Sequence, residues 1–245
     1  MKKTAFVLAG CLLAAPALGK TRISKEALSY SGGDRTYYLY APEELPDEPV
    51  PLLLTFHGSG RDGRSLVEKW DALARRHGFI VAGLDAANPQ TWIMPNDGPG
   101  LVQALVDALA SRYSVDERRL YLFGHSAGAV FAMKLGLMES EYFAAVAVHA
   151  GSFRQPQDFQ VLELAKRKVP IKIIVGDRDA YFPLASVKAT VKAFEESDLP
   201  VDLELIKGHD HWYYDRAKKF NTSAWEFLVT HDLGEAPRFH EYRFN

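Results

Sequence analysis

The residues Gly124-His125-Ser126-Ala127-Gly128 fit the pattern G-x-S-x-G. In this pattern a serine lies on a tight turn between a strand and a helix, where its hydroxyl is presented as a nucleophile. The flanking sequence agrees, because residues 120–123 have the character of a buried strand and residues 127–138 that of a helix. The two glycines keep side chains out of the crowded turn. We therefore predict that Ser126 is a nucleophile.

A serine hydroxyl needs a base to activate it, and the base needs an acid that orients it. In this arrangement the partners follow in the order Ser, acid, His. His209 and His211 both follow the last predicted strand, residues 201–206, and position alone does not separate them. Asp177 and Asp179 follow the preceding strand, residues 171–175. We predict Asp179 as the acid because it lies farther along the loop, whereas Asp177 is placed to cap the turn.

The reaction would also need two N–H donors for the negative charge that develops on the substrate oxygen. One donor is predicted to be the amide of Ala127, directly after the nucleophile. The second should come from the loop after the strand at residues 50–56, for which we predict the amide of Ser59, with Gly58 and Gly60 as alternatives. His57 in the same loop is expected to brace the loop rather than act as a base.

Short apolar runs alternate with helical stretches along the chain. This alternation predicts βαβ units and an α/β fold, with a mostly parallel central sheet flanked by helices on both faces. The tail, residues 231–245, is expected to form a loop. The predicted strands are residues 36–41, 50–56, 79–84, 120–123, 144–148, 171–175 and 201–206, and the predicted helices are residues 65–77, 101–113, 127–138, 186–195 and 216–229.

The first 19 residues are typical of a signal peptide, with Lys2 and Lys3 before an apolar stretch and small residues at the expected cleavage site after Gly19. We therefore expect a secreted or periplasmic protein in which residues 20–245 form one domain. Residues 8–11 also resemble a lipoprotein box, in which Cys11 would carry the lipid. Cys11 is the only cysteine, so a mature chain that begins at residue 20 would have no disulfide or cysteine metal site.

The chain has 245 residues and a formal net charge of −2. Because this charge gives no overall positive field, we expect neither a nucleic acid partner nor attachment to an anionic membrane. The apolar stretch near the N-terminus is too short to span a bilayer, so we expect no integral membrane segment in the mature chain. A small-molecule or polymeric ester is the expected partner. Two tryptophans, Trp92 and Trp212, are predicted to line a substrate pocket, although either is equally consistent with core or rim packing.

These motifs resemble those of secreted polyhydroxybutyrate depolymerases and feruloyl esterases, which are α/β-hydrolases. The resemblance extends from residue 51 to about residue 151 and includes residues 57–60, 115–121 and 124–128. Residues 208–214 are more similar to S-formylglutathione hydrolase and esterase D, and that similarity aligns the catalytic histidine with His211. The resemblance implies hydrolysis of carboxylic esters through an acyl-enzyme, without a metal or organic cofactor.

Two other classes of function remain open at this point. A peptidase or thioesterase would use the same three residues on a different carbonyl compound. A catalytically silent binding protein would keep the fold without the chemistry, although an intact set of Ser126, Asp179 and His211 argues against it. The segment His209-Asp210-His211 by itself also suggests a zinc site, but no accompanying metal motif supports that interpretation.

Overall fold

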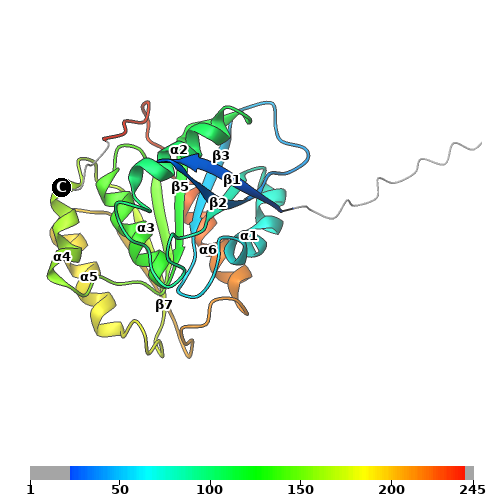
Figure 1. The fold of residues 1–245 in the computed structure, drawn as a ribbon. Helices are drawn as coiled ribbons and strands as arrows, with labels where there is room; N and C mark the ends of the chain where they lie inside the picture. The colour runs from blue at the N-terminus through cyan, green and yellow to red at the C-terminus, as the bar shows by residue number, and fades with distance from the viewer. Residues whose placement is uncertain (1–22, 241–245) are drawn as a thin grey trace, which may run out of the picture.

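Eight strands form one sheet in the order β1-β2-β4-β3-β5-β6-β7-β8 in a computed structural model that describes residues 23–240 (Figure 1). The pairs from β4 through β8 are parallel, and β1 and β2 form an antiparallel hairpin at one edge. The strands are β1 Ser24–Tyr30, β2 Gly33–Tyr40, β3 Val50–Phe56, β4 Ile80–Leu84, β5 Val115–His125, β6 Ala145–His149, β7 Ile171–Gly176 and β8 Val201–Ile206.

Helices cover both faces of this sheet (Figure 1). Helices α2, α3 and α5 pack into the apolar core on one face, and α1 and α6 pack into the core on the other. Every residue of β3, β4, β6 and β7 is buried, as expected for parallel strands covered on both sides. The helices are α1 Arg64–His77, α2 Pro99–Ala110, α3 Ala127–Met138, α4 Pro156–Phe159, η1 Gln160–Leu164 (a 3₁₀ helix), α5 Leu184–Glu196 and α6 Ala217–Leu228.

The predicted α/β architecture is confirmed, and each predicted strand and helix is present. Three elements were not predicted, namely β1, α4 and η1, and β5 begins five residues earlier than expected, at Val115 instead of Leu120. Strand β1 lies at the sheet edge with alternating half-buried and exposed residues, so it lacks the apolar run by which the central strands are recognised. The first part of β5 is likewise polar and only partly buried.

The predicted signal peptide, residues 1–19, and the lipoprotein-type Cys11 lie outside the described residues. Export and the domain boundary at residue 20 therefore stay predictions. Within residues 23–240, no helix combines the length and hydrophobicity needed to cross a bilayer. The predicted loop at the C-terminus agrees with the structure as far as residue 240.

Candidate active site

The strand-to-helix turn around Ser126 has the strained geometry expected of a nucleophile elbow. Ser126 lies between the end of β5 and the start of α3, with φ of 58° and ψ of −119°. This backbone conformation is unusual for a residue with a side chain and persists only where its surroundings enforce it. A Cβ atom at Gly128 would lie 2.0 Å from the carbonyl oxygen of Phe56, and one at Gly124 would lie 2.2 Å from the carbonyl oxygen of Gly128. Both flanking positions therefore require glycine.

Three predicted residues meet in one continuous line of hydrogen bonds. The Nε2 atom of His211 lies 2.9 Å from the Oγ atom of Ser126. The Nδ1 atom of the same ring lies 2.8 Å from the Oδ2 atom of Asp179. The turn after β5 supplies the hydroxyl, the loop after β7 the carboxylate and the loop after β8 the imidazole, so the carboxyl ends of three parallel strands of one sheet bring the three side chains together.

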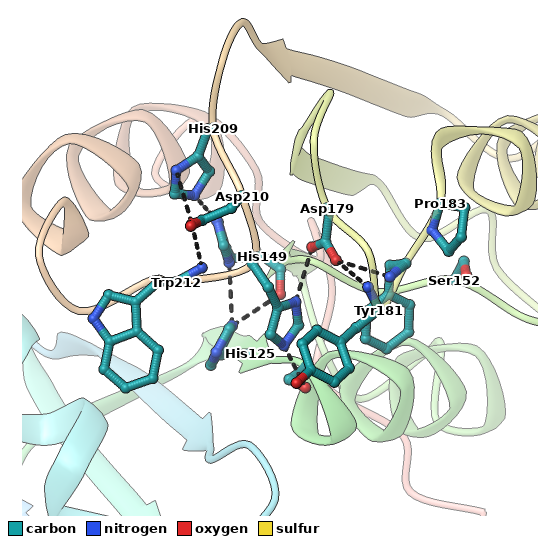
Figure 2. A network of polar contacts seen from close by, with 12 residues as sticks. His125, His149, Ser152, Asp179, Tyr181, Pro183, His209, Asp210 and Trp212 are labelled. Carbon is teal, nitrogen blue, oxygen red and sulfur yellow. Dashed lines mark hydrogen bonds and ion pairs between the residues drawn. The ribbon is translucent and has the colours of Figure 1, made fainter.

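The environment of Asp179 keeps its carboxylate ionised. Its side chain is completely buried, and its Oδ1 atom accepts hydrogen bonds from the amides of Tyr181 (2.9 Å) and Phe182 (2.8 Å) (Figure 2). Burial opposes ionisation, but the hydrogen bonds from His211 and from the two amides outweigh it and lower the pKa of Asp179. A fixed negative charge therefore faces the side of the imidazole that points away from Ser126.

Asp177, the alternative acid, has a different place. Its exposed carboxylate accepts a hydrogen bond from the amide of Gly208 at 2.6 Å, which links the loop after β7 to the loop after β8. The amide of Arg178 donates to the carbonyl oxygen of His209 and adds a second link between the same loops. Asp177 thus helps to hold together the two loops that carry Asp179 and His211, and does not contact the imidazole.

His209, the alternative base, belongs to a second line of hydrogen bonds made of three buried histidines (Figure 2). Its Nε2 atom lies 3.0 Å from Nε2 of His149, and Nδ1 of His149 lies 3.1 Å from Nδ1 of His125. We call His125, His149 and His209 the histidine chain. His209 and His211 therefore face different partners.

Burial keeps the histidine chain uncharged. Desolvation lowers the pKa of His149 well below its usual value, and the neighbouring histidines lower it further. Desolvation, followed by repulsion from His211, lowers the pKa of His125 to about 3. A neutral imidazole has one N–H donor and one acceptor nitrogen, so three neutral rings can satisfy each other in sequence.

The histidine chain is not among the features predicted from the sequence. The sequence does contain one relevant feature, a histidine at the end of each of two strands. In the structure these are His125 and His149, which are direct partners in the register of the adjacent parallel strands β5 and β6. A histidine at the same position of two neighbouring strands places both rings at one edge of the sheet. Only the strand order reveals that the strands are neighbours.

The amides predicted to bind the developing negative charge belong to Ala127, next to Ser126 in the chain, and to Ser59, which lines the same pocket as Ser126. Ala127 is the first residue of α3, and Gly58 approaches so closely that a Cβ atom there would lie 3.1 Å from Cβ of Ser126. The amide of Gly60 donates to the carbonyl oxygen of Pro89 at 2.8 Å, which removes it from the candidates. The roles of Ser59 and Ala127 stay predictions, with Gly58 as the remaining alternative.

His57 braces this loop, as expected. Its Nε2 atom accepts a hydrogen bond from the amide of Ala86 at 3.1 Å. Nδ1 must then carry the proton, and it donates to the carbonyl oxygen of Gly58 at 2.9 Å. Both ring nitrogens are therefore occupied within the protein. The ring fixes the loop after β3 and leaves no free nitrogen for proton transfer.

A pocket of about 490 Å³ opens above Ser126 and His211. Trp212 lines it and is 44% exposed, and its contact with a substrate stays a prediction. The Arg61 guanidinium lies over the Trp212 ring at 5.1 Å and over the Tyr214 ring at 4.7 Å. The rim therefore combines flat aromatic surfaces with polar groups.

Trp92 was also predicted to line a substrate pocket, but it does not line the pocket above Ser126. Its indole ring stacks on Phe131, with ring centroids 4.8 Å apart, and its Nε1 atom donates to the carbonyl oxygen of His57 at 2.9 Å. It lines a separate cavity that runs beside α3. The sequence could not distinguish these two positions, because both follow strands that end at the same edge of the sheet.

The sheet order, the elbow and the meeting of Ser126, His211 and Asp179 define the class of this protein as an α/β-hydrolase. A sequence model of the dienelactone hydrolase family matches residues 88–228. The chain therefore belongs to the dienelactone hydrolase family.

Similar proteins include several esterases. The chain is 28% identical over 169 residues to the bifunctional acetylxylan esterase/xylanase XynS20E of Neocallimastix patriciarum, covering 67% of this chain and 24% of that protein. It is 26% identical over 162 residues to the poly(3-hydroxybutyrate) depolymerase of Ralstonia pickettii, covering 56% of this chain and 33% of that protein. The matches thus span about a quarter to a third of the length of these two relatives.

Solved structures share the fold at low sequence identity. An S-formylglutathione hydrolase from Agrobacterium tumefaciens superimposes with a TM-score of 0.67 at 17% identity, covering 85% of this chain and 94% of that one. A ferulic acid esterase from Anaeromyces mucronatus superimposes with a TM-score of 0.68 at 16% identity, covering 86% and 90%. Both relatives had been suggested by the sequence motifs, and they support the fold.

Proposed function

We propose that this protein is a serine esterase that hydrolyses carboxylic esters through an acyl-enzyme intermediate. In this proposal Ser126 is the nucleophile, His211 the general base and Asp179 the residue that orients the base. The observation that carries the proposal is the unbroken line from the Asp179 carboxylate through His211 to the Ser126 hydroxyl, with distances of 2.8 and 2.9 Å. The esterases among its relatives support the same reaction class.

The direction of proton transfer follows from the hydrogen bonds. Since Nδ1 of His211 faces an ionised carboxylate, it carries the proton and donates, which leaves Nε2 free to accept the proton of the Ser126 hydroxyl. As the serine oxygen attacks the ester carbonyl, the imidazole becomes positively charged, and the buried Asp179 carboxylate stabilises that charge. The imidazolium then donates its proton to the departing alcohol.

The second half of the reaction uses the same groups in reverse. Water enters the site, loses a proton to His211 and attacks the acyl-enzyme, and the acid is released as the Ser126 hydroxyl is restored. In both halves the carbonyl oxygen becomes negative, and we assign its stabilisation to the amides of Ala127 and Ser59. One such donor typically contributes about 3–4 kcal/mol to transition-state binding.

Labelling with a fluorophosphonate tests the proposed nucleophile. The wild-type protein should form a covalent adduct at Ser126, detected as a mass increase and located by peptide mapping. Ser126→Ala should not be labelled, whereas Ser111→Ala should be labelled like wild type, because Ser111 is exposed at the end of α2. Absence of labelling in the folded wild-type protein would favour a non-catalytic binding protein instead.

A panel of substrates tests the reaction class. We expect turnover of p-nitrophenyl and feruloyl esters and no comparable turnover of peptide amides, because an amine is a poorer leaving group than an alcohol. Thioesters in the same panel report on the thioesterase alternative. A higher kcat/KM for a peptide amide or a thioester than for its matched oxygen ester would replace the esterase assignment.

We also propose that the chain is exported, with cleavage after Gly19. The support is the charged and then apolar character of residues 1–19. Expression of the full chain in a bacterial host, followed by intact-mass measurement of the exported protein, should give an N-terminus at Lys20. A lipid-modified N-terminus at Cys11 would support the lipoprotein alternative, and an uncleaved cytoplasmic product would contradict export.

A further inference from the structure

A second cavity of about 460 Å³ lies beside α3 and is separate from the pocket above Ser126. Five of its lining residues, at positions 127, 130, 131, 134 and 138, follow the helical spacing that places them on one face of α3. We call this cavity the α3 groove. Eleven residues of helix rise about 16 Å, so this face is longer than an extended octanoyl chain.

The α3 groove is linked to the reactive centre through Ala127. This residue lines the groove and directly follows the proposed nucleophile, and its amide is a proposed donor to the carbonyl oxygen of the substrate. A substrate held by that amide would therefore have its carbonyl carbon close to a residue that lines the groove.

The walls of the groove are apolar. Val130 and Phe131 of α3 face Val161 and Leu164 of η1. Lys134 is the single charged lining residue, and its ammonium group lies 2.6 Å from the Asp158 carboxylate. Such a surface favours a hydrocarbon ligand over a polar one, because a polar group would lose its hydrogen bonds to water without replacement.

The wall of the groove that Trp92 forms is held in place by contacts within the protein. Trp92 stacks on Phe131, and its only polar atom is used on the carbonyl oxygen of His57, so the rest of the ring is apolar surface. The loop that carries Trp92 is fixed by the buried Asp97, which accepts hydrogen bonds from the amides of Ala87 (2.9 Å) and Ile93 (2.8 Å). A preformed site of this kind loses little entropy on binding.

The chemistry decides which arm of an ester enters the groove. The alcohol oxygen must accept a proton from His211, and His211 lines the other pocket together with Asp210 and Arg61. The alcohol arm therefore occupies that pocket, and the acyl arm leaves the carbonyl carbon in the other direction. We propose that the α3 groove binds the acyl chain of the substrate, and that the preferred substrates are esters of linear aliphatic acids with a polar or aromatic alcohol. This inference rests on the proposed esterase function.

A series of p-nitrophenyl esters from acetate to octanoate tests this proposal. Burial of one methylene group is worth about 0.8 kcal/mol, which sets an upper limit of about fourfold in kcat/KM for each added group. We expect a rise of two- to fourfold per methylene from acetate through octanoate. A flat series, in a protein that a fluorophosphonate still labels at Ser126, would overturn the α3 groove and leave the esterase function intact.

Filling the groove should remove the preference. Val130→Trp and Val161→Trp add bulk from opposite walls, and each should lower kcat/KM for octanoate at least tenfold while changing that for acetate less than twofold. The matched control Val191→Trp lies on α5, outside both cavities, and should leave both values unchanged. Equal losses on acetate and octanoate in both groove variants, with thermal unfolding unchanged, would contradict the proposal.

A second series of substrates varies the alcohol part of the ester. A series of acetate esters with alcohols of increasing length should respond equally in wild type and in Val130→Trp, because the alcohol lies in the pocket with His211. A selective loss of the long alcohols in Val130→Trp would show that the groove binds the alcohol arm and would overturn the assignment of the acyl arm. Absence of any turnover together with absence of labelling would instead count against the esterase function itself.

Discussion

Two lines of hydrogen-bonded side chains each include a histidine from the loop after β8, and these two histidines, His209 and His211, are only two residues apart. His211 connects Ser126 to the Asp179 carboxylate, whereas His209 connects through His149 to His125. Both lines contain imidazole rings at ordinary hydrogen-bond distances. They differ in that the first ends at a buried negative charge and the second contains only neutral rings.

This difference accounts for the two roles. An imidazole that takes up a proton needs a nearby negative charge to stabilise it, and among the histidines of these two lines His211 alone has one within hydrogen-bond distance. The histidine chain lies in the interior, where an unpaired charge is costly, so its rings stay neutral and act as packed hydrogen-bond partners. His209 and His211 lie in the same loop, so position in the loop does not decide the function of a histidine. Its hydrogen-bond partner and its access to the substrate do.

Substitution of the two histidines should separate these roles most strongly. His211→Gln should lower kcat/KM for a p-nitrophenyl ester by about 10⁴-fold or more, because the base is lost. His209→Gln keeps a hydrogen-bonding group toward His149 and should stay within tenfold of wild type. Both proteins should be checked by circular dichroism. A similar loss of kcat/KM in a folded His209→Gln protein would contradict the inference that the two histidines have different roles.

The two aspartates should differ in the same way with a smaller effect. Asp179→Asn removes the charge that orients and stabilises His211 and should lower kcat by about 10⁴-fold. Asp177→Asn keeps an acceptor for the amide of Gly208 and should change kcat less than threefold. Steady-state kinetics on the same ester measure both values. Comparable losses would show that the loop link at Asp177 matters as much as the carboxylate of Asp179.

The histidine chain should affect stability more than catalysis. His149→Leu removes the ring partner of His209, whereas Nδ1 of His125 keeps the backbone carbonyl oxygen of residue 149 at 3.4 Å. One buried group left unsatisfied costs about 1–3 kcal/mol, so unfolding in urea should show a loss of that size. Activity of the folded protein should fall less than tenfold. Unchanged stability would show that water or a rearrangement replaces these hydrogen bonds.

Acid should destabilise the protein through the same chain. The pKa of His125 is lowered to about 3 and that of His149 lies well below its usual value, so both rings stay neutral in the folded protein while the unfolded chain binds protons below about pH 6.5. Their contribution is therefore present above pH 6.5 and is lost as the pH falls toward 3. Each ring adds about 1.4 kcal/mol per pH unit to the slope.

Urea unfolding between pH 7 and pH 5 measures this slope, and His149→Leu serves as the control. Removal of one neutral buried ring should reduce the slope by the contribution of one histidine. An identical slope in wild type and His149→Leu would show that other groups cause the acid sensitivity.

The sequence predicted the reactive line better than the histidine chain for a physical reason. The elbow has a local pattern, since strand, turn and glycines lie within a few residues of Ser126, and Asp179 and His211 follow strands that are easily recognised. The histidine chain depends on β5 and β6 being neighbours in register, which is a property of the folded sheet. The difference between the positions of Trp92 and Trp212 is also set by tertiary packing.

Edge strand β1 illustrates the same limit at the level of the fold. Its residues alternate between half-buried and exposed, and the turn to β2 uses Ser31 and Gly32 with φ of 54° and 82°. Two consecutive residues in this conformation are typical of a tight hairpin, but the pair Ser-Gly is a weaker sequence signal for it than Asn-Gly. Pairing with β2 therefore supplies order that the local sequence does not encode.

The ion pair between Arg35 and Asp97 offers a route by which the substrate specificity of this protein can evolve. Arg35 belongs to β2, the strand next to the edge strand β1, and its guanidinium contacts the carboxylate that fixes the loop carrying Trp92. Mutations in a peripheral hairpin can thus reshape one wall of the α3 groove while the elbow stays untouched. If that groove sorts substrates as proposed, new specificities are open to selection, or to a protein engineer, without first sacrificing the reactive serine.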